Sequence, residues 1–176
     1  YMGENNLAFI DLKISCIESN VFFEICNMQK LSFQPYSLVT KSSKNKRYIF
    51  DQIRKKFVVL TPEEWVRQHV VCYLLNEKKA PKSWINVEKQ FTLANLKKRF
   101  DVIVFSDDGS VQLLVECKAP NVTISQETFD QIARYNMNFN AQYMMITNGL
   151  NHYYCKFDYK NQQYHFCEDL PILSSH

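Results

Sequence analysis

The stretch Leu113-Leu-Val-Glu-Cys-Lys-Ala-Pro120 joins an apolar run to two charged residues. The run from Val111 to Val115 predicts a buried strand, and charges at its end are costly in a core unless they are paired or bind a metal. Strand side chains alternate between faces, so Glu116 and Lys118 share one face, and Cys117 is expected on the other as a small buried residue. The strand therefore ends in a carboxylate and an ammonium, which form either a surface salt bridge or part of an active site.

The elements expected around this strand alternate between helix and strand. Thr61-Pro-Glu-Glu64 predicts a helix start, because Thr is a favoured N-cap, Pro fits the first turn and Glu64 completes a capping box. This helix is expected to reach about Asn76 with one buried apolar face. The other expected core elements are strands 85–93, 99–105, 111–118 and 142–147 and a helix from Ser125 to about Asn138. The order helix, three strands, helix, strand predicts an α/β fold with a mixed sheet.

Two hairpins are expected outside this core. Their strands are 48–50 with 57–60, after a polar loop at 41–47, and 152–157 with 163–167. Residues 1–27 show no clean period, and Met28 is a natural start. We therefore expect 1–27 to be a leader that is non-native or poorly ordered, and 28–176 to form a single domain.

The composition is that of an ordinary globular protein, with 46% hydrophobic and 22% charged residues. No apolar run approaches the roughly 20 residues needed to span a bilayer, and the six cysteines contain no Cys-x-x-Cys pair. A cytoplasmic protein without membrane, zinc or disulfide sites is expected. The window 41–56 holds seven basic residues against Asp51, which suits a polyanion such as nucleic acid but also a solvated loop.

A second acid lies on the preceding strand. Alternation places Phe100, Val102 and Val104 on one face of this strand and Asp101 on the other. The turn at 107–110 predicts a hairpin that brings Asp101 near Glu116, and two such carboxylates repel unless a cation lies between them. Mg²⁺ takes one or two carboxylates and completes its shell with water and substrate phosphate.

The motifs in their order resemble those of a known nuclease group. Asp101 followed by Glu116-Cys-Lys118 resembles the acid, then acid-x-Lys, of the PD-(D/E)xK superfamily, although Phe100 stands in place of the Pro. Gln131-Ile-Ala-Arg-Tyr135 resembles the Gln-x-x-x-Tyr motif of its exonuclease-like branch. With Thr147-Asn-Gly149, these motifs most resemble the N-terminal nuclease domain of type I restriction enzyme R subunits, over about residues 46–168.

The resemblance implies a restriction-endonuclease-like core and Mg²⁺-dependent hydrolysis of DNA, with Mn²⁺ able to substitute. Asp101 and Glu116 would bind the metal, Lys118 would assist the attacking water or the charged transition state, and Gln131 with Tyr135 would position the strand. The implied partners are DNA and a separate motor or specificity subunit, because the chain has no Gly-x-x-x-x-Gly-Lys loop for ATP. The expected contacts to the DNA backbone are Lys44, Lys46, Arg47, Arg54, Lys55 and Lys56.

Several alternatives stay open at this point. Glu64 is either a capping residue or a further metal ligand, and Glu88 is either a solvated strand residue or a further ligand. The four histidines have no paired metal-ligand spacing, so His69 is expected in the core or on the helix surface. In place of a nuclease, the chain could be a catalytically silent DNA-binding or regulatory module with the same fold.

Overall fold

The computed structural model describes residues 28–93 and 96–174, with the side chains of 91–98 left out. The chain divides into the units 1–30 and 31–176, and the fold given below is that of 31–176. The leader expected at 1–27 lies outside the described residues. The helices are α2 (Pro62–Asn76), the short 3-10 helix η1 (Lys82–Trp84) and α3 (Gln126–Met137). The strands are β1 (Thr40–Ser43), β2 (Lys46–Asp51), β3 (Lys56–Val59), β4 (Ile85–Leu93), β5 (Leu96–Phe105), β6 (Val111–Cys117), β7 (Tyr143–Thr147), β8 (His152–Asp158) and β9 (Gln163–Cys167).

Six of these strands form a mixed sheet in the order β4-β5-β6-β7-β8-β9. Neighbours are antiparallel except β6 and β7, which are parallel and are joined through α3. A parallel pair needs such a long crossover, whereas antiparallel neighbours can be joined by short turns. The predicted α/β fold, with its mixed sheet and C-terminal hairpin, is therefore confirmed.

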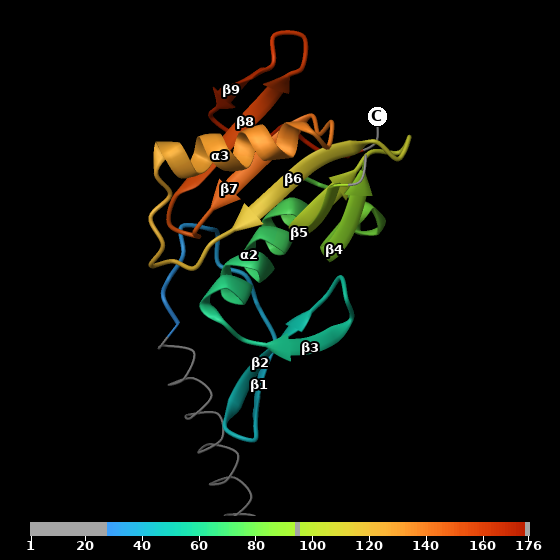
Figure 1. Ribbon diagram of the computed structural model, residues 1–176. Helices are drawn as coiled ribbons and strands as arrows, with labels where there is room; N and C mark the ends of the chain where they lie inside the picture. The colour runs from blue at the N-terminus through green and yellow to red at the C-terminus, as the bar shows by residue number, and fades with distance from the viewer. Residues whose placement is uncertain (1–27, 94–95, 175–176) are drawn as a thin grey trace, which may run out of the picture. The chain divides into compact units, whose positions relative to one another are not determined.

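The two helices pack against opposite faces of this sheet (Figure 1). Val66 and Val70 of α2 join a core cluster with Val102 and Val115, whereas Phe129 and Ala133 of α3 belong to a second cluster. Leu114 of β6 and Ile146 of β7 are sheet residues in that second cluster. The strands in the middle of the sheet are thus buried on both sides, which explains their nearly continuous apolar sequences.

The expected N-terminal hairpin forms from β2 and β3, and a further strand, β1, extends it to a three-stranded antiparallel sheet, β1-β2-β3. The extra strand β1 comes from the polar stretch that the sequence suggested was a loop. Lys44 and Asn45 connect β1 to β2, and both have positive φ, 48° and 58°. Two such residues form the tight turn that matches strand twist, so a polar segment pairs as an edge strand without an apolar pattern.

The alternation expected along β5 is broken next to Asp101. Val102 packs in the α2-side cluster, but Phe100 packs in the α3-side cluster, against Phe139 at 4.8 Å between ring centroids. On the adjacent strand, Glu88 has φ of 50°, and the regular pairs skip from Val87 with Val102 to Lys89 with Phe100. The regular pairing of β4 with β5 is therefore interrupted between these pairs. At this point Phe100 and Val102 of β5 face opposite sides of the sheet, whereas the sequence predicted one shared side.

Candidate functional site

The middle of β5 and the end of β6 bring the predicted acids together. The pairing of Val102 with Val115 puts Asp101 and Glu116 at the next opposing positions. Asp101 Oδ2 accepts a hydrogen bond from the backbone N–H of Cys117 at 2.7 Å. Lys118 Nζ donates to Glu116 Oε1 at 3.0 Å, so the ammonium and both carboxylates lie in one half-buried site.

Arg67 of α2 is the cation closest to the first acid. Its Nη2 donates to Asp101 Oδ1 at 2.8 Å and to Glu63 Oε1 at 3.1 Å. Its Nη1 donates to Glu64 and lies 3.3 Å from Glu88 Oε1. Arg67 is buried, and one guanidinium therefore serves four carboxylates at the edge of the site.

A second arginine, Arg54, balances the same carboxylates from the turn between β2 and β3. It donates to Asp51 Oδ2 at 2.6 Å, Glu64 Oε1 at 2.9 Å and Glu88 Oε2 at 2.8 Å. Gln68 adds hydrogen bonds to Asp51 at 3.0 Å and Glu64 at 2.8 Å. We call Arg54, Arg67 and the carboxylates that they bind the two-arginine network.

Arg54 was expected among the DNA-backbone contacts, and its position differs from that expectation. Three carboxylates surround its guanidinium, and its side chain is only 17% exposed. The turn is organised by Asp51, whose Oδ1 accepts the N–H groups of Ile53 and Arg54 at 2.8 and 2.7 Å. The positive charge of Arg54 thus pairs with carboxylates inside the protein, because the buried Asp51 needs a counter-charge.

The predicted capping box at the start of α2 forms only in part. Thr61 Oγ1 accepts the N–H of Glu64 at 3.0 Å, as an N-cap should. The Glu64 carboxylate, however, binds Arg54, Arg67 and Gln68. Glu64 therefore belongs to the network beside the site, and the interpretation of its side chain as a cap is wrong.

The helix α2 is also buried more completely than a single apolar face requires. Nearly every residue from Glu64 to Leu74 is buried, including Gln68. The apolar side of α2 packs on the sheet, whereas its polar stripe meets the turn that carries Arg54. The three-stranded sheet is therefore what allows charged residues of α2 to be buried with partners.

The charges of the site shift its acid–base properties. Burial raises the pKa of Asp101, and Glu116 raises it further, although Arg67 and the Cys117 N–H oppose both effects. For Lys118, burial acts to lower the pKa, but Glu116 and Asp101 outweigh it and the pKa is raised. Burial likewise acts to lower the pKa of Arg67, and its carboxylate neighbours raise it. The site therefore keeps both cations charged and disfavours the Asp101 carboxylate.

Cys117 separates Glu116 from Lys118 and takes no part in this charge cluster with its side chain. Its thiol is buried in the α2-side core, as expected, and burial raises its pKa well above the ordinary value. A thiol of this kind is a poor nucleophile. Its structural contribution to the site is the backbone N–H that holds Asp101.

The Thr147-Asn-Gly149 turn fixes the backbone beside Lys118. The Lys118 N–H donates to the Thr147 carbonyl at 2.8 Å, and Asn148 Nδ2 donates to the Val122 carbonyl at 2.9 Å. Gly149 has φ of +83°, and a Cβ there would lie 2.7 Å from a methyl carbon of Leu31. This motif therefore holds the strand end that carries the ammonium.

Gln131 and Tyr135 lie on α3 at positions four apart, and both are exposed. Tyr135 is 38% exposed, and its ring lies 5.8 Å from that of Phe139. Since the buried residues of α3 are Phe129, Ala133 and Asn136, both motif residues lie off the packed face of the helix. Their predicted role in positioning DNA stays a prediction.

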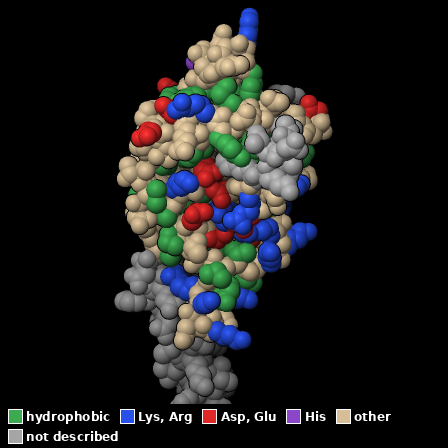
Figure 2. Space-filling model, in the orientation of Figure 1, with side chains coloured by type: hydrophobic (Ala, Val, Ile, Leu, Met, Phe, Trp, Pro, Cys, Tyr) green, Lys and Arg blue, Asp and Glu red, His purple; other side chains and the backbone are tan. Residues whose placement is uncertain are grey.

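The other basic residues expected to contact DNA are available at the surface. Lys44, Lys46, Lys55 and Lys56 are exposed, and Arg47 is half-buried. Figure 2 shows Lys and Arg side chains over the three-stranded sheet and a mixed group of acidic and basic side chains above it. This arrangement places positive charge next to the acids of the site.

Comparison with known proteins adds one family. The family model of the Type I restriction enzyme R protein N terminus (HSDR_N) matches residues 62–171, more than half of the chain. The chain belongs to this family. No curated protein matches the chain. The match covers α2, the six-stranded sheet and α3, and with them every candidate catalytic residue.

Among the described residues, no three His, Cys, Asp or Glu side chains are grouped to hold a metal ion. His69 is buried, and its Nδ1 lies 2.9 Å from the Trp65 carbonyl, which agrees with the expected structural role. In the same part of the chain, no helix is long and apolar enough to cross a membrane. Of the predicted ligands, Asp101 and Glu116 lie at opposing positions on β5 and β6, whereas Glu64 and Glu88 are each bound by Arg54 and Arg67.

Sequence reasoning missed Arg67, Gln68 and Asp51. A signal was present in α2, because Glu64, Arg67 and Gln68 are spaced by three and four residues and form a polar stripe opposite the apolar one. Asp51 and Arg54 carried no comparable signal, since an acid and a base three residues apart are common in exposed turns.

Proposed function

We propose that this domain hydrolyses DNA phosphodiester bonds with Mg²⁺, and that Asp101, Glu116 and Lys118 are its catalytic residues. The observation that carries the proposal is the convergence of two carboxylates and an ammonium where the middle of β5 lies beside the end of β6. Membership of the restriction-enzyme family supports the same function.

The donor set suits Mg²⁺. Asp101 and Glu116 offer hard oxygen ligands, and their proximity contributes to the raised pKa of Asp101. A dication between them would relieve this repulsion, and water and substrate phosphate would supply the other ligands. Bound there, Mg²⁺ would supply a Lewis acid for the phosphoryl group.

Lys118 suits the stabilisation of negative charge better than the removal of a proton. Its pKa is raised by Glu116 and Asp101, so the amine stays protonated near neutral pH. A fixed ammonium stabilises the charge that develops on phosphorus, whereas a general base must be neutral. The hydrogen bond of Lys118 to Glu116 and its backbone bond to Thr147 keep it oriented for this role.

Arg67 would act as a positioning residue. Together with the Cys117 N–H, it holds both oxygens of Asp101, which fixes the direction of the carboxylate. The same contact lowers the negative charge available to a metal. We expect Asp101 to share its oxygens between Arg67 and the ion, with Glu64 and Glu88 compensating Arg67 rather than binding Mg²⁺.

DNA would reach this site along basic and exposed residues. Phosphate contacts from exposed lysines supply affinity without sequence preference. Gln131 and Tyr135 would touch the strand from α3, because both are exposed and lie on one side of that helix. A motor or specificity subunit would be a separate partner.

The test is cleavage of single- and double-stranded DNA with Mg²⁺ or Mn²⁺. Asp101→Ala and Lys118→Ala should each lower the rate by at least about 100-fold, and a chelator should abolish it. Lys160→Ala, which removes an exposed lysine from the β8–β9 turn, should cleave like the unaltered protein. Equal rates in all four proteins would reveal a contaminant and reject the assignment.

A catalytically silent module is the second candidate, and one observation favours it. Both oxygens of Asp101 already accept hydrogen bonds, from Arg67 and from the Cys117 N–H. If Arg67 permanently replaces the metal, the domain would bind DNA with a strong salt dependence and would not cleave with any metal. Salt-dependent binding without turnover by the purified protein would select this function.

A further inference from the structure

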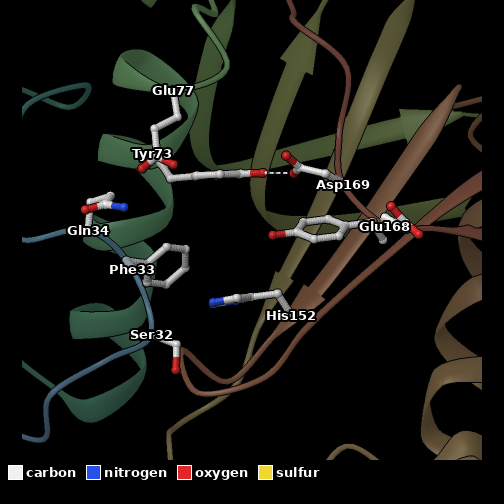
Figure 3. Close-up of a pocket in the computed structure, with 9 residues that line it drawn as sticks. Ser32, Phe33, Gln34, Tyr73, Glu77, His152, Glu168 and Asp169 are labelled. Carbon is white, nitrogen blue, oxygen red and sulfur yellow. Dashed lines mark hydrogen bonds between the residues drawn. The ribbon is translucent and has the colours of Figure 1, made fainter.

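A pocket of about 440 Å³ lies between the C-terminal half of α2, the start of β8 and the segment after β9. Figure 3 shows Phe33 and His152 pointing toward one another, with Tyr73 reaching toward Asp169. We call it the aromatic pocket. None of the residues proposed for DNA hydrolysis lines it.

Four rings build the walls of this pocket. Phe33 lies 4.3 Å from His152 and 5.9 Å from Tyr73, measured between ring centroids. Tyr154 lies 6.5 Å from Tyr73 and 6.4 Å from His152. The four rings thus form one contact cluster that lines the pocket, and the faces of its aromatic rings carry the partial negative charge that attracts organic cations.

Carboxylates add negative charge to these walls. Glu77, Glu168 and Asp169 line the pocket, and no lysine or arginine does. Lys78 pairs with Asp169 from outside the lining, and Tyr73 donates to Asp169 at 2.6 Å. Glu77 accepts a hydrogen bond from Tyr36, and among the described residues neither Glu77 nor Glu168 forms an ion pair with a lysine or arginine. The pocket is therefore acidic in a protein whose net charge is +3.

His152 is the remaining polar ring of the pocket. Its Nδ1 lies 2.7 Å from Thr147 Oγ1, and the backbone of Ser32 also interacts with the ring. Burial lowers the pKa of His152, so its ring is neutral near pH 7. His152 therefore adds no positive charge to the walls of the pocket.

We propose that the aromatic pocket binds the guanidinium group of an arginine side chain presented by a partner polypeptide. A guanidinium is planar, stacks on aromatic faces and donates paired hydrogen bonds to carboxylates. Its apolar stem would pack against Phe33 and Tyr73, and its charge would be balanced by Glu77 and Glu168. This interaction goes beyond DNA hydrolysis and gives the domain a docking point for another protein.

The charge of the pocket separates this partner from nucleic acid. Phosphates would meet three carboxylates and no basic lining residue, so binding of DNA or of a nucleotide phosphate is disfavoured. A neutral planar ligand would stack on the rings but would gain nothing from the carboxylates. Charge is therefore the property that the experiment must vary.

The experiment is a titration of the whole chain with a Gly-Arg-Gly peptide, followed by the His152 ring signals in NMR and by calorimetry. Saturable binding is expected, and the peptide with citrulline in place of arginine should bind at least about tenfold more weakly. Citrulline keeps the shape and loses the charge. Arginine amide without flanking residues should bind, but less tightly than the peptide.

Two variants connect binding to the pocket. Glu77→Gln combined with Glu168→Gln should weaken arginine peptide binding by at least about tenfold, with unchanged circular dichroism. Glu127→Gln removes an exposed carboxylate on α3, outside the pocket, and should leave the affinity unchanged. The proposal is overturned if the citrulline peptide binds equally well or if binding does not saturate. It is also overturned if Glu127→Gln weakens binding as much as the pocket variant does, or if arginine amide binds and the peptide does not.

Discussion

Arg67 Nη2 donates a hydrogen bond to Asp101 Oδ1 at 2.8 Å, which joins α2 to the candidate metal ligand on β5. Asp101 thus has a cationic partner within the protein itself, which it shares with three other carboxylates. Arg67 and the Cys117 N–H fix the direction of the Asp101 carboxylate, and Arg67 balances part of its negative charge. Metal affinity and protein stability should consequently depend on the same pair.

Mg²⁺ should stabilise the folded domain, because the ion would bind the native site and not the unfolded chain. At a concentration ten times the Kd, the gain is about 1.4 kcal/mol, which raises Tm by about 3–5 °C. Asp101→Asn should remove this rise. Asp130→Asn alters a carboxyl on α3 and should keep it, so loss of the rise in both variants would argue against a site at Asp101.

Arg67→Met should destabilise the domain by about 3–5 kcal/mol, because four carboxylates would lose a buried counter-charge. Urea unfolding at pH 7 measures this loss. Arg134→Met is the matched control, since Arg134 is exposed on α3 and should cost no more than about 0.5 kcal/mol. A loss below about 1 kcal/mol for Arg67→Met would show that the two-arginine network contributes little.

Gly149→Ala should cost more than Gly109→Ala, although both glycines have positive φ, +83° and +79°. A Cβ at Gly109 meets nothing within 4 Å, so only the backbone strain of about 1–2 kcal/mol applies. At Gly149, the added atom would also lie 2.7 Å from Leu31 and 3.0 Å from Val66. Equal free energies of unfolding for the two variants would mean that these side chains move aside freely.

Asp169 should make stability depend on pH. Burial acts to raise its pKa, but Lys78 and Tyr73 lower it below the ordinary value. The folded state thus gains stability above the unfolded-state pKa and loses it as pH falls through the lowered folded-state pKa. In urea unfolding across this range, Asp169→Asn should be less stable at neutral pH and approach the unaltered protein in acid. When Asp169→Asn is made in the Lys78→Gln variant, it should lower the free energy of unfolding at neutral pH by less than it does in the unaltered protein.

Gln131→Ala and Tyr135→Ala should each lower DNA cleavage by about tenfold, because each loses a contact that positions the strand. Both residues are exposed, so the stability should change by no more than about 0.5 kcal/mol. Gln142→Ala, an exposed residue before β7, serves as the control. Normal cleavage by both α3 variants would mean that α3 contributes no residue to the site and that Asp101, Glu116 and Lys118 act without it.

Much of the fold follows from local sequence. The Thr61 cap places the start of α2 correctly, and the strands expected at 85–93, 111–118 and 163–167 match β4, β6 and β9 to within one residue at each end. These elements are predictable because capping and hydrophobic burial act over a few residues. The approach of Asp101 to Glu116 also follows, since a short hairpin fixes the register between neighbouring strands.

The environment of the site could not be predicted in the same way. The Arg54 contact with Glu88 spans 34 residues, and nothing near Arg54 distinguishes it from the exposed Lys55. The interrupted strand pairing at Glu88 depends on a positive φ, which glutamate does not favour. Both features arise from tertiary contacts, which override local preference.

The turn that carries Asp51 and Arg54 lies outside the family-matched segment 62–171. A protein trimmed to that segment would keep every candidate catalytic residue and yet lose half of the positive charge that balances Glu64 and Glu88. The segment that defines the family is thus smaller than the unit able to fold around its own acids, and a shortened version of this domain should begin before β1.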